Sequence, residues 1–215
     1  MPSTAKILMK LLMGVSDSAT SDHGKGMDSP RGCVPPVTVG SHSAWIPNVT
    51  VHTHRGQTAR FYDDLIARGT VLLHCVSTRD EAGCRSLETM ARVQDLLGEE
   101  QGRAVFIYSI AADPDGTPEA LRVLAERYRA GHGWSFLTGD PAELSLLRTR
   151  MFRSGGEDCS MHLIRYGNEA VGLWGGVAAH SSPESIAHRL SWVTPKDRPA
   201  GPPIRGGPFP PGPDS

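Results

Sequence analysis

The chain has 215 residues, with 22 lysines and arginines against 23 aspartates and glutamates, and a formal net charge of -1. Its length is typical of one domain, and its balanced charge provides no field that would hold nucleic acid or an anionic membrane. Four cysteines are too few for a disulfide framework in a chain of this length, and no two of them form the Cys-x-x-Cys pair of a zinc ribbon. Each cysteine is therefore interpreted by itself.

The two ends differ in composition from the middle of the chain. Residues 16–44 are rich in Ser, Gly, Asp and His, so we expect 1–44 to be a flexible segment. Within this segment, residues 7–15 fit either a degraded signal region or a frayed start. No stretch of the chain approaches the length of a membrane span, which needs about 18 apolar residues. This excludes a multi-span membrane protein. Residues 195–215 hold eight prolines and four glycines and predict a disordered tail, which leaves 45–194 as the folded domain.

The first half of this domain predicts a parallel pair of strands. Thr70 to Val76 and Ala104 to Ile110 are short apolar runs rich in β-branched and aromatic residues, as in strands buried on both faces. Apolar residues from Ser86 to Leu97 recur with a period near 3.6, and Gly98 follows them, which predicts an amphipathic crossover helix. A strand, a helix and a strand in this order predict parallel pairing.

The second half continues the alternation. The expected elements are a helix capped by Thr117 and running through Tyr128, a strand from Trp134 to Leu137, a helix opening at Asp140, a strand from Met161 to Tyr166 that turns at Gly167 and Asn168, and a helix from Ser182 to Val193. This order predicts an α/β domain with a mixed central sheet.

Three passages of the domain carry a resemblance to a known family. They are Ile46 to Ile66 with His54-Arg55-Gly56-Gln57 at its centre, Ser77-Thr78-Arg79 with the helix behind it, and Asp113-Pro114 with Thr117-Pro118-Glu119 and Trp134 to Gly139. Together they resemble the Sco/SenC family of thioredoxin-fold copper proteins. The resemblance implies a thioredoxin-like fold, with helices on both sides of a mixed central sheet and an N-terminal hairpin extension.

The same resemblance implies a function and a location. Sco/SenC proteins handle copper and help to assemble the CuA centre of cytochrome c oxidase, so the expected cofactor is copper and the expected partner is the oxidase subunit that carries CuA. The implied protein is a copper chaperone or assembly factor, not an enzyme. The implied location is periplasmic or membrane-associated.

The metal motif departs from the family pattern, in which copper is held by a Cys-x-x-x-Cys motif and a distant histidine. Aligned on Thr78-Arg79, the two cysteine positions are Asp80 and Cys84, so one thiolate is missing. The distant histidine is replaced by Cys159 or Ser160, depending on which neighbouring residues are aligned. With His162 nearby, the resemblance implies Asp80, Cys84, Cys159 and His162 as metal ligands of a drifted site.

Three hypotheses for these residues remain open. Thiolates favour Cu(I) and imidazole accepts Cu(II), so a two-thiolate copper site with one harder carboxylate ligand is the first. A disulfide between Cys84 and Cys159 is the second. In the third, the site has decayed and both cysteines are free thiols.

A different function is also open. The alternative is a metal-free interaction or thiol redox-sensing protein on the same fold. Cys84 is the expected reactive thiol, because the helix dipole and Arg79 or Arg85 favour a thiolate at the start of a helix. A thiol peroxidase is less favoured, since Thr78 stands six residues before Cys84 and peroxidases use Thr-x-x-Cys.

Other residues are interpreted structurally. Cys33 lies in the linker and Cys75 is a core residue of the first strand, where it and His74 face opposite sides of the sheet; the role of His74 is left undecided. The histidines around the N-terminal hairpin, His42, His52 and His54, form a loose cluster; additional metal ligands are the alternative interpretation, and an incidental cluster is the favoured one. Asp113-Pro114 and Asn168 are turn formers.

Overall fold

The computed structural model describes residues 38–39, 44–67, 69–79, 81–114, 116–154, 157–158 and 160–195. Of the expected flexible segment and tail, this includes only residues 38–39, 44 and 195. The two-residue strand β1 (Thr38–Val39) lies within the expected linker and pairs with a strand from the C-terminal half.

Eight of the described strands form one mixed sheet in the order β1-β10-β9-β4-β5-β6-β2-β3. Their bounds are β2 Thr50–Thr53, β3 Thr58–Arg60, β4 Thr70–Val76, β5 Val105–Ala111, β6 Trp134–Gly139, β9 Leu163–Asn168 and β10 Leu173–Ala178. β4, β5 and β6 are parallel, and the other pairings are antiparallel. The expected parallel pair is confirmed: Thr70 lies opposite Val105.

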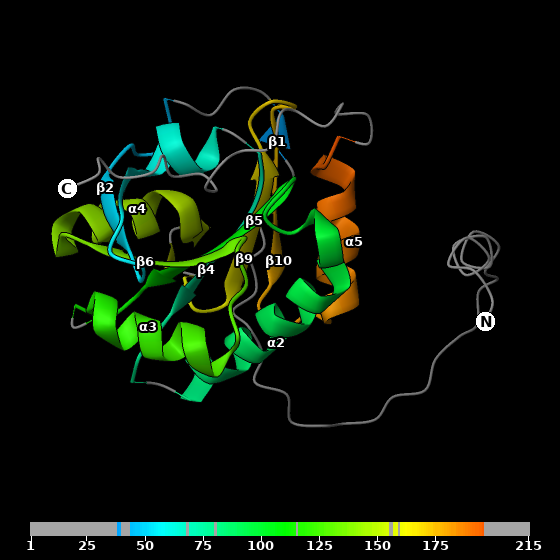
Figure 1. Cartoon of the computed structure of the whole chain (residues 1–215). Coiled ribbons are helices and arrows are strands. Elements are labelled where there is room, and N and C mark those ends of the chain that lie inside the picture. The colour runs from blue at the N-terminus through cyan, green and yellow to red at the C-terminus, as the bar shows by residue number, and fades with distance from the viewer. Residues whose placement is uncertain are drawn as a thin grey trace, which may run out of the picture.

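Helices cover both faces of the sheet. They are the π-helix η1 (Phe61–Ile66), α2 (Glu81–Leu97), the 3-10 helix η2 (Gly98–Glu100), α3 (Pro118–Arg127), α4 (Pro141–Phe152) and α5 (Pro183–Val193). Residues of η1 and α4 form one core with the sheet, and residues of α2, α3 and α5 form the other. Figure 1 shows α4 and α3 on opposite sides of the central strands.

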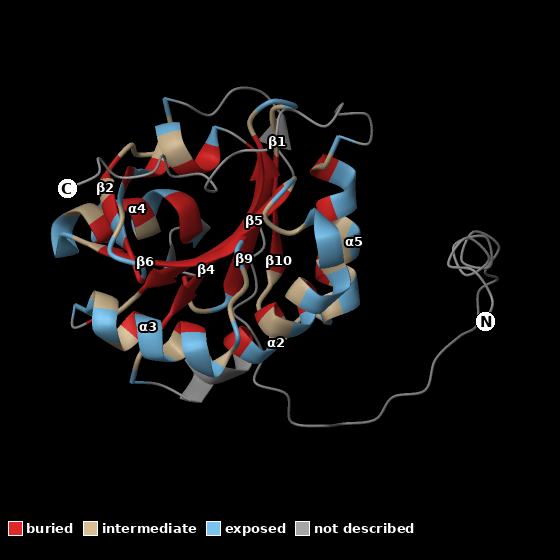
Figure 2. Cartoon of the chain, in the orientation of Figure 1, coloured by how far each residue is buried: buried red, intermediate tan, exposed pale blue. Residues whose placement is uncertain are grey.

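The central strands are continuous apolar runs because both faces are covered. Along β4, Val71, Leu73 and Cys75 enter one core, while Leu72 and Val76 enter the other. In Figure 2 these strands are buried along their length, and the helices expose only their outer faces.

The predicted helix starts are confirmed where a cap is present. The side chain of Thr117 accepts a hydrogen bond from the Ala120 N–H, that of Asp140 accepts from the N–H groups of Ala142 and Glu143, and that of Ser182 accepts from Ser185. The helix expected at Ser86 instead begins at Glu81. Its first residues, Glu-Ala-Gly-Cys-Arg, lack the apolar period that revealed the rest.

The expected turn at Gly167 and Asn168 is wrong. Both residues belong to β9, and the chain turns after them, where Gly172 N–H bonds to Glu169 C=O at 3.1 Å. Gly167 lies opposite Trp174, and a Cβ there would lie 2.3 Å from the Trp174 ring. Glycine at this position therefore permits a close approach between strands.

Candidate metal centre

The edge of the sheet where β4 ends brings together the segments that hold the candidate ligands. β9 runs antiparallel to β4, with Arg165 opposite Leu73, so the start of β9 lies beside the end of β4. Asp80 and Cys84 follow β4, and Cys159 and His162 precede β9. The topology therefore brings both segments to one edge of the sheet.

The Asp113 carboxylate accepts hydrogen bonds from the residues that directly follow β4. The Ser77 hydroxyl donates to Asp113 Oδ2 at 2.9 Å, and Thr78 donates its N–H at 2.6 Å and its hydroxyl at 3.1 Å to the same oxygen. Burial alone would raise the pKa of Asp113, but these hydrogen bonds and the Arg79 charge outweigh it and lower the pKa below its ordinary value. Asp113 thus stabilises the Thr78-Arg79 segment that precedes the first candidate ligand.

The interpretation of Asp113 and Asn168 as simple turn formers is incomplete. The Asp113 C=O does accept the Gly116 N–H in a turn, but its side chain reaches back to Ser77 and Thr78, which are far away in the sequence. The buried Asn168 side chain accepts the Ala170 N–H, as in a turn, and also donates to the Thr70 hydroxyl of β4 at 2.9 Å. No local pattern signals such long-range partners.

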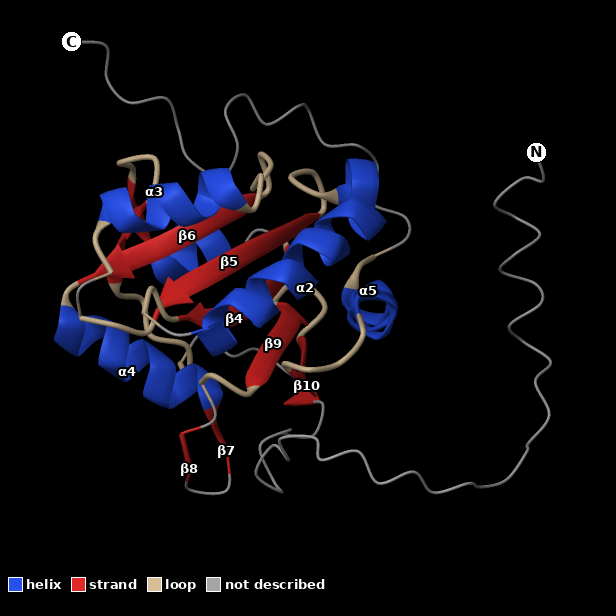
Figure 3. Cartoon of the chain, turned by 90° about the horizontal axis from the view of Figure 1, so that it is seen from below, coloured by secondary structure: helices blue, strands red, loops and turns tan. Residues whose placement is uncertain are grey.

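The segment before β9 follows a small hairpin. The hairpin consists of β7 (Arg153–Ser154) and β8 (Glu157–Asp158), and in Figure 3 it extends beyond the end of α4. Asp158 Oδ1 accepts the Ser160 N–H at 2.9 Å. Ser160 is buried, whereas the His162 side chain is exposed.

Cys75 lies one residue before the end of β4 and is buried and free of a disulfide. Burial raises the pKa of its thiol, and of the two charges near it Arg148 lowers the pKa while Asp158 raises it. The Arg148 guanidinium donates to the Ala112 carbonyl. The prediction of Cys75 as a core residue is confirmed, and its protonated thiol is a poor nucleophile.

The four candidate ligands are only partly described. Asp80 and Cys159 lie outside the described residues, and Cys84 is described only as part of the backbone of α2, in its first turn. Within the described part of the chain, no three His, Cys, Asp or Glu side chains form a group that could hold a metal ion. The convergence of Asp80, Cys84, Cys159 and His162 stays a prediction.

Three described histidines outside the candidate ligand set, two in the N-terminal hairpin and one in β4, have structural partners. His52 is exposed, with Nδ1 3.0 Å from the Thr58 hydroxyl, and His54 Nδ1 accepts the Phe136 N–H at 3.1 Å. His42 lies outside the described residues. His74 is buried, and its Nε2 lies 2.6 Å from the Ser109 hydroxyl, which also accepts the Trp134 Nε1–H. His74 thus belongs to a polar contact inside the core.

Among the described residues, no helix is long and apolar enough to cross a membrane. The apolar segment 7–15 and Cys33 lie outside them.

No protein-family model matches the sequence, and no curated protein matches it. Solved structures do match. A Sco/SenC family lipoprotein from Bacillus anthracis has a TM-score of 0.57 and 15% identity, covering 69% of this chain and 94% of that chain. A copper-bound Sco protein from Bradyrhizobium japonicum has a TM-score of 0.53 and 17% identity, covering 66% and 95%. Copper-bound yeast Sco has a TM-score of 0.56 and 10% identity, covering 74% and 92%.

At these identities the similarity defines the fold. The chain has the thioredoxin-like α/β fold of the Sco/SenC structures. The resemblance drawn from the three sequence passages is confirmed at that level.

Proposed function

We propose that the protein is a divergent Sco/SenC-like factor that handles copper during assembly of cytochrome c oxidase. Neighbouring structures are described as copper-bound Sco proteins, and one as a member of the Sco family of cytochrome c oxidase assembly proteins. The observation that carries the proposal is the strand register, because it brings the segments after β4 and before β9 to one edge of the Sco-like sheet.

The proposed ligands include both soft and hard donor groups. Cys84 and Cys159 supply thiolates, which favour Cu(I), and His162 supplies an imidazole that suits both oxidation states. Asp80 supplies a carboxylate where the family has a thiolate, and this hard ligand weakens the preference for Cu(I). We therefore expect copper binding that is weaker than that of a complete two-cysteine, one-histidine site.

Two features of the described structure favour such a site. Asp113 fixes Ser77 and Thr78, so the chain leaves β4 in one direction toward the candidate ligands. α2 begins at Glu81, so Cys84 lies in the first turn, where the positive end of the helix dipole stabilises a thiolate. A preorganised segment lowers the cost of metal binding, and metal ligation requires the thiolate form that a helix start favours.

Titration of the reduced full chain with Cu(I), in competition with a chelator, tests the proposal. We expect one Cu(I) per chain and at least tenfold weaker binding in Cys84→Ser and in Cys159→Ser. Cys33→Ser is the control, because Cys33 is not one of the proposed ligands, and it should bind as the wild type does. Absence of stoichiometric binding, or equal binding by all three variants, would contradict the proposal.

The remaining parts of the proposal concern setting and partner. The factor would act in the periplasm or at a membrane, on the oxidase subunit that carries CuA, and without enzymatic turnover. Copper transfer from the loaded protein to a purified CuA domain would be followed by the visible absorption of the CuA centre. Copper that stays on the chain at equilibrium with that domain would remove the assembly role while leaving copper binding intact.

A further inference from the structure

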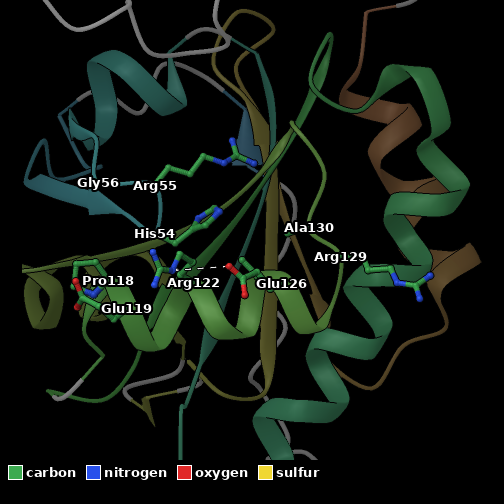
Figure 4. A pocket seen from close by; sticks show the side chains of 10 residues that line it. His54, Arg55, Gly56, Pro118, Glu119, Arg122, Glu126, Arg129 and Ala130 are labelled. Carbon is green, nitrogen blue, oxygen red and sulfur yellow. Dashed lines mark ion pairs between the residues drawn. The ribbon is translucent and has the colours of Figure 1, made fainter.

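A cavity of about 560 Å³ lies between α3 and the turn that joins β2 to β3. Its volume falls within the roughly 300–1,000 Å³ typical of small-molecule sites. The polar side chains among its lining residues are those of His54, Arg55, Glu119, Arg122, Glu126 and Arg129, and Figure 4 shows that of Arg129 pointing away from the others. None of them is a candidate copper ligand, so the cavity is a separate site.

His54 is a fixed donor at this cavity. Its side chain is only 8% exposed, and its ring packs edge-on against Phe136 with 5.7 Å between ring centroids. Because Nδ1 accepts the Phe136 N–H, the neutral ring carries its proton on Nε2. No residue in the described ranges accepts this proton, and Figure 4 shows the ring pointing into the cavity. Burial, then the Arg55 charge, lower the pKa of His54 to about 4, so the ring is neutral at pH 7.

Arg55 and Arg122 add positive charge beside this donor. The Arg55 guanidinium donates one hydrogen bond, from Nη2 to the Gly131 carbonyl at 3.1 Å, and within the described part of the chain its other N–H groups have no acceptor. Arg122 meets Glu126 at 3.9 Å, an exposed pair that contributes little. These donors match a carboxylate, which accepts hydrogen bonds on both oxygens.

The two glutamates of the cavity restrict which charged groups the ligand can carry. Glu119 and Glu126 line the same cavity and would repel a phosphate dianion, while they attract an ammonium group. We propose that this cavity binds a small zwitterion, such as an amino acid or a dipeptide. Its carboxylate contacts His54 Nε2–H, Arg55 and Arg122, and its ammonium group contacts Glu119 and Glu126.

An NMR titration of the ¹⁵N-labelled full chain tests this site with three probes: glycylglycine, N-acetylglycine and inorganic phosphate. We expect glycylglycine to shift the Phe136 amide and the His54 ring signals saturably, and to bind more tightly than either of the other two. Arg55→Gln should weaken glycylglycine at least fivefold. Arg127→Gln, an exposed arginine on α3 outside the cavity, is the control and should change nothing.

Glu126→Gln separates the two halves of the ligand, because it should weaken glycylglycine and leave N-acetylglycine unchanged. The proposal is overturned if glycylglycine causes no saturable shift, if phosphate binds at least as tightly, or if Arg55→Gln and Arg127→Gln bind equally. All three altered residues are exposed, so the variants are expected to fold. None of these outcomes depends on copper.

Discussion

Asp113 connects two segments that lie far apart in the sequence, because its carboxylate accepts hydrogen bonds from both Ser77 and Thr78. Replacement by alanine leaves these donors without their acceptor. We expect Asp113→Ala to lower the free energy of unfolding by about 2 kcal/mol, measured in urea at pH 7. Asp95→Ala removes an exposed carboxylate from α2 and should cost far less. Equal losses in the two variants would show that the contact contributes nothing.

His74 gives the protein a pH-dependent stability. Burial lowers its pKa from 6.5 to about 4, and its Nε2 lies 2.6 Å from the Ser109 hydroxyl, which accepts the Trp134 Nε1–H. The unfolded chain binds a proton below pH 6.5 and the folded chain does not, so stability falls as the pH drops from 6.5 to 4. The full loss is on the order of 3 kcal/mol.

Urea unfolding at pH 7, 5.5 and 4.5 measures this effect. His74→Phe should flatten the pH dependence, while His188→Gln, which alters an exposed histidine of α5, should keep it. His54 has a pKa lowered in the same direction, so some dependence should remain in His74→Phe. An unchanged slope in His74→Phe would contradict the assignment.

Paired glycines and aromatic residues fix how β9 and β10 pack. Gly167 lies opposite Trp174, and Gly175 lies opposite Tyr166. A Cβ at either glycine would lie 2.3 Å or 2.5 Å from the facing ring. Gly167→Ala should therefore lower the free energy of unfolding by about 3 kcal/mol.

A double-mutant cycle with Trp174→Ala assigns this loss to the ring. The alanine at position 174 removes the clash, so the double variant should lose less stability than the sum of the two single variants. Urea unfolding of all four proteins measures the coupling. Additive losses, within about 0.5 kcal/mol, would place the effect of Gly167→Ala elsewhere.

Elements with a local signal could be predicted, and those held by distant partners could not. The caps at Thr117, Asp140 and Ser182 and the apolar run of β4 each identify themselves within a few residues, and the structure has all of them. β10 (Leu173–Ala178) contains two glycines and gives no strand pattern by itself. It forms because it pairs along β9.

At the scale of the whole molecule, the fold could be predicted but the site only outlined. The three matching passages indicated the Sco-like fold, and the solved structures confirm it. Two of the ligand positions, Asp80 and Cys159, differ from the family pattern. The sequence therefore predicts at which edge of the sheet the site lies, but not how its side chains are arranged. The zwitterion cavity was also missed, since His54 and α3 lie far apart in the chain and His54 was interpreted as incidental.

The central claim is that copper binds through sulfur at the edge where β4 ends. X-ray absorption at the copper edge of the Cu(I)-loaded, reduced full chain tests it most directly. We predict two sulfur ligands, with one lost in Cys84→Ser and one in Cys159→Ser, and no change in Cys33→Ser. A copper environment of nitrogen and oxygen alone, or one with sulfur that neither Cys84→Ser nor Cys159→Ser alters, would contradict the account.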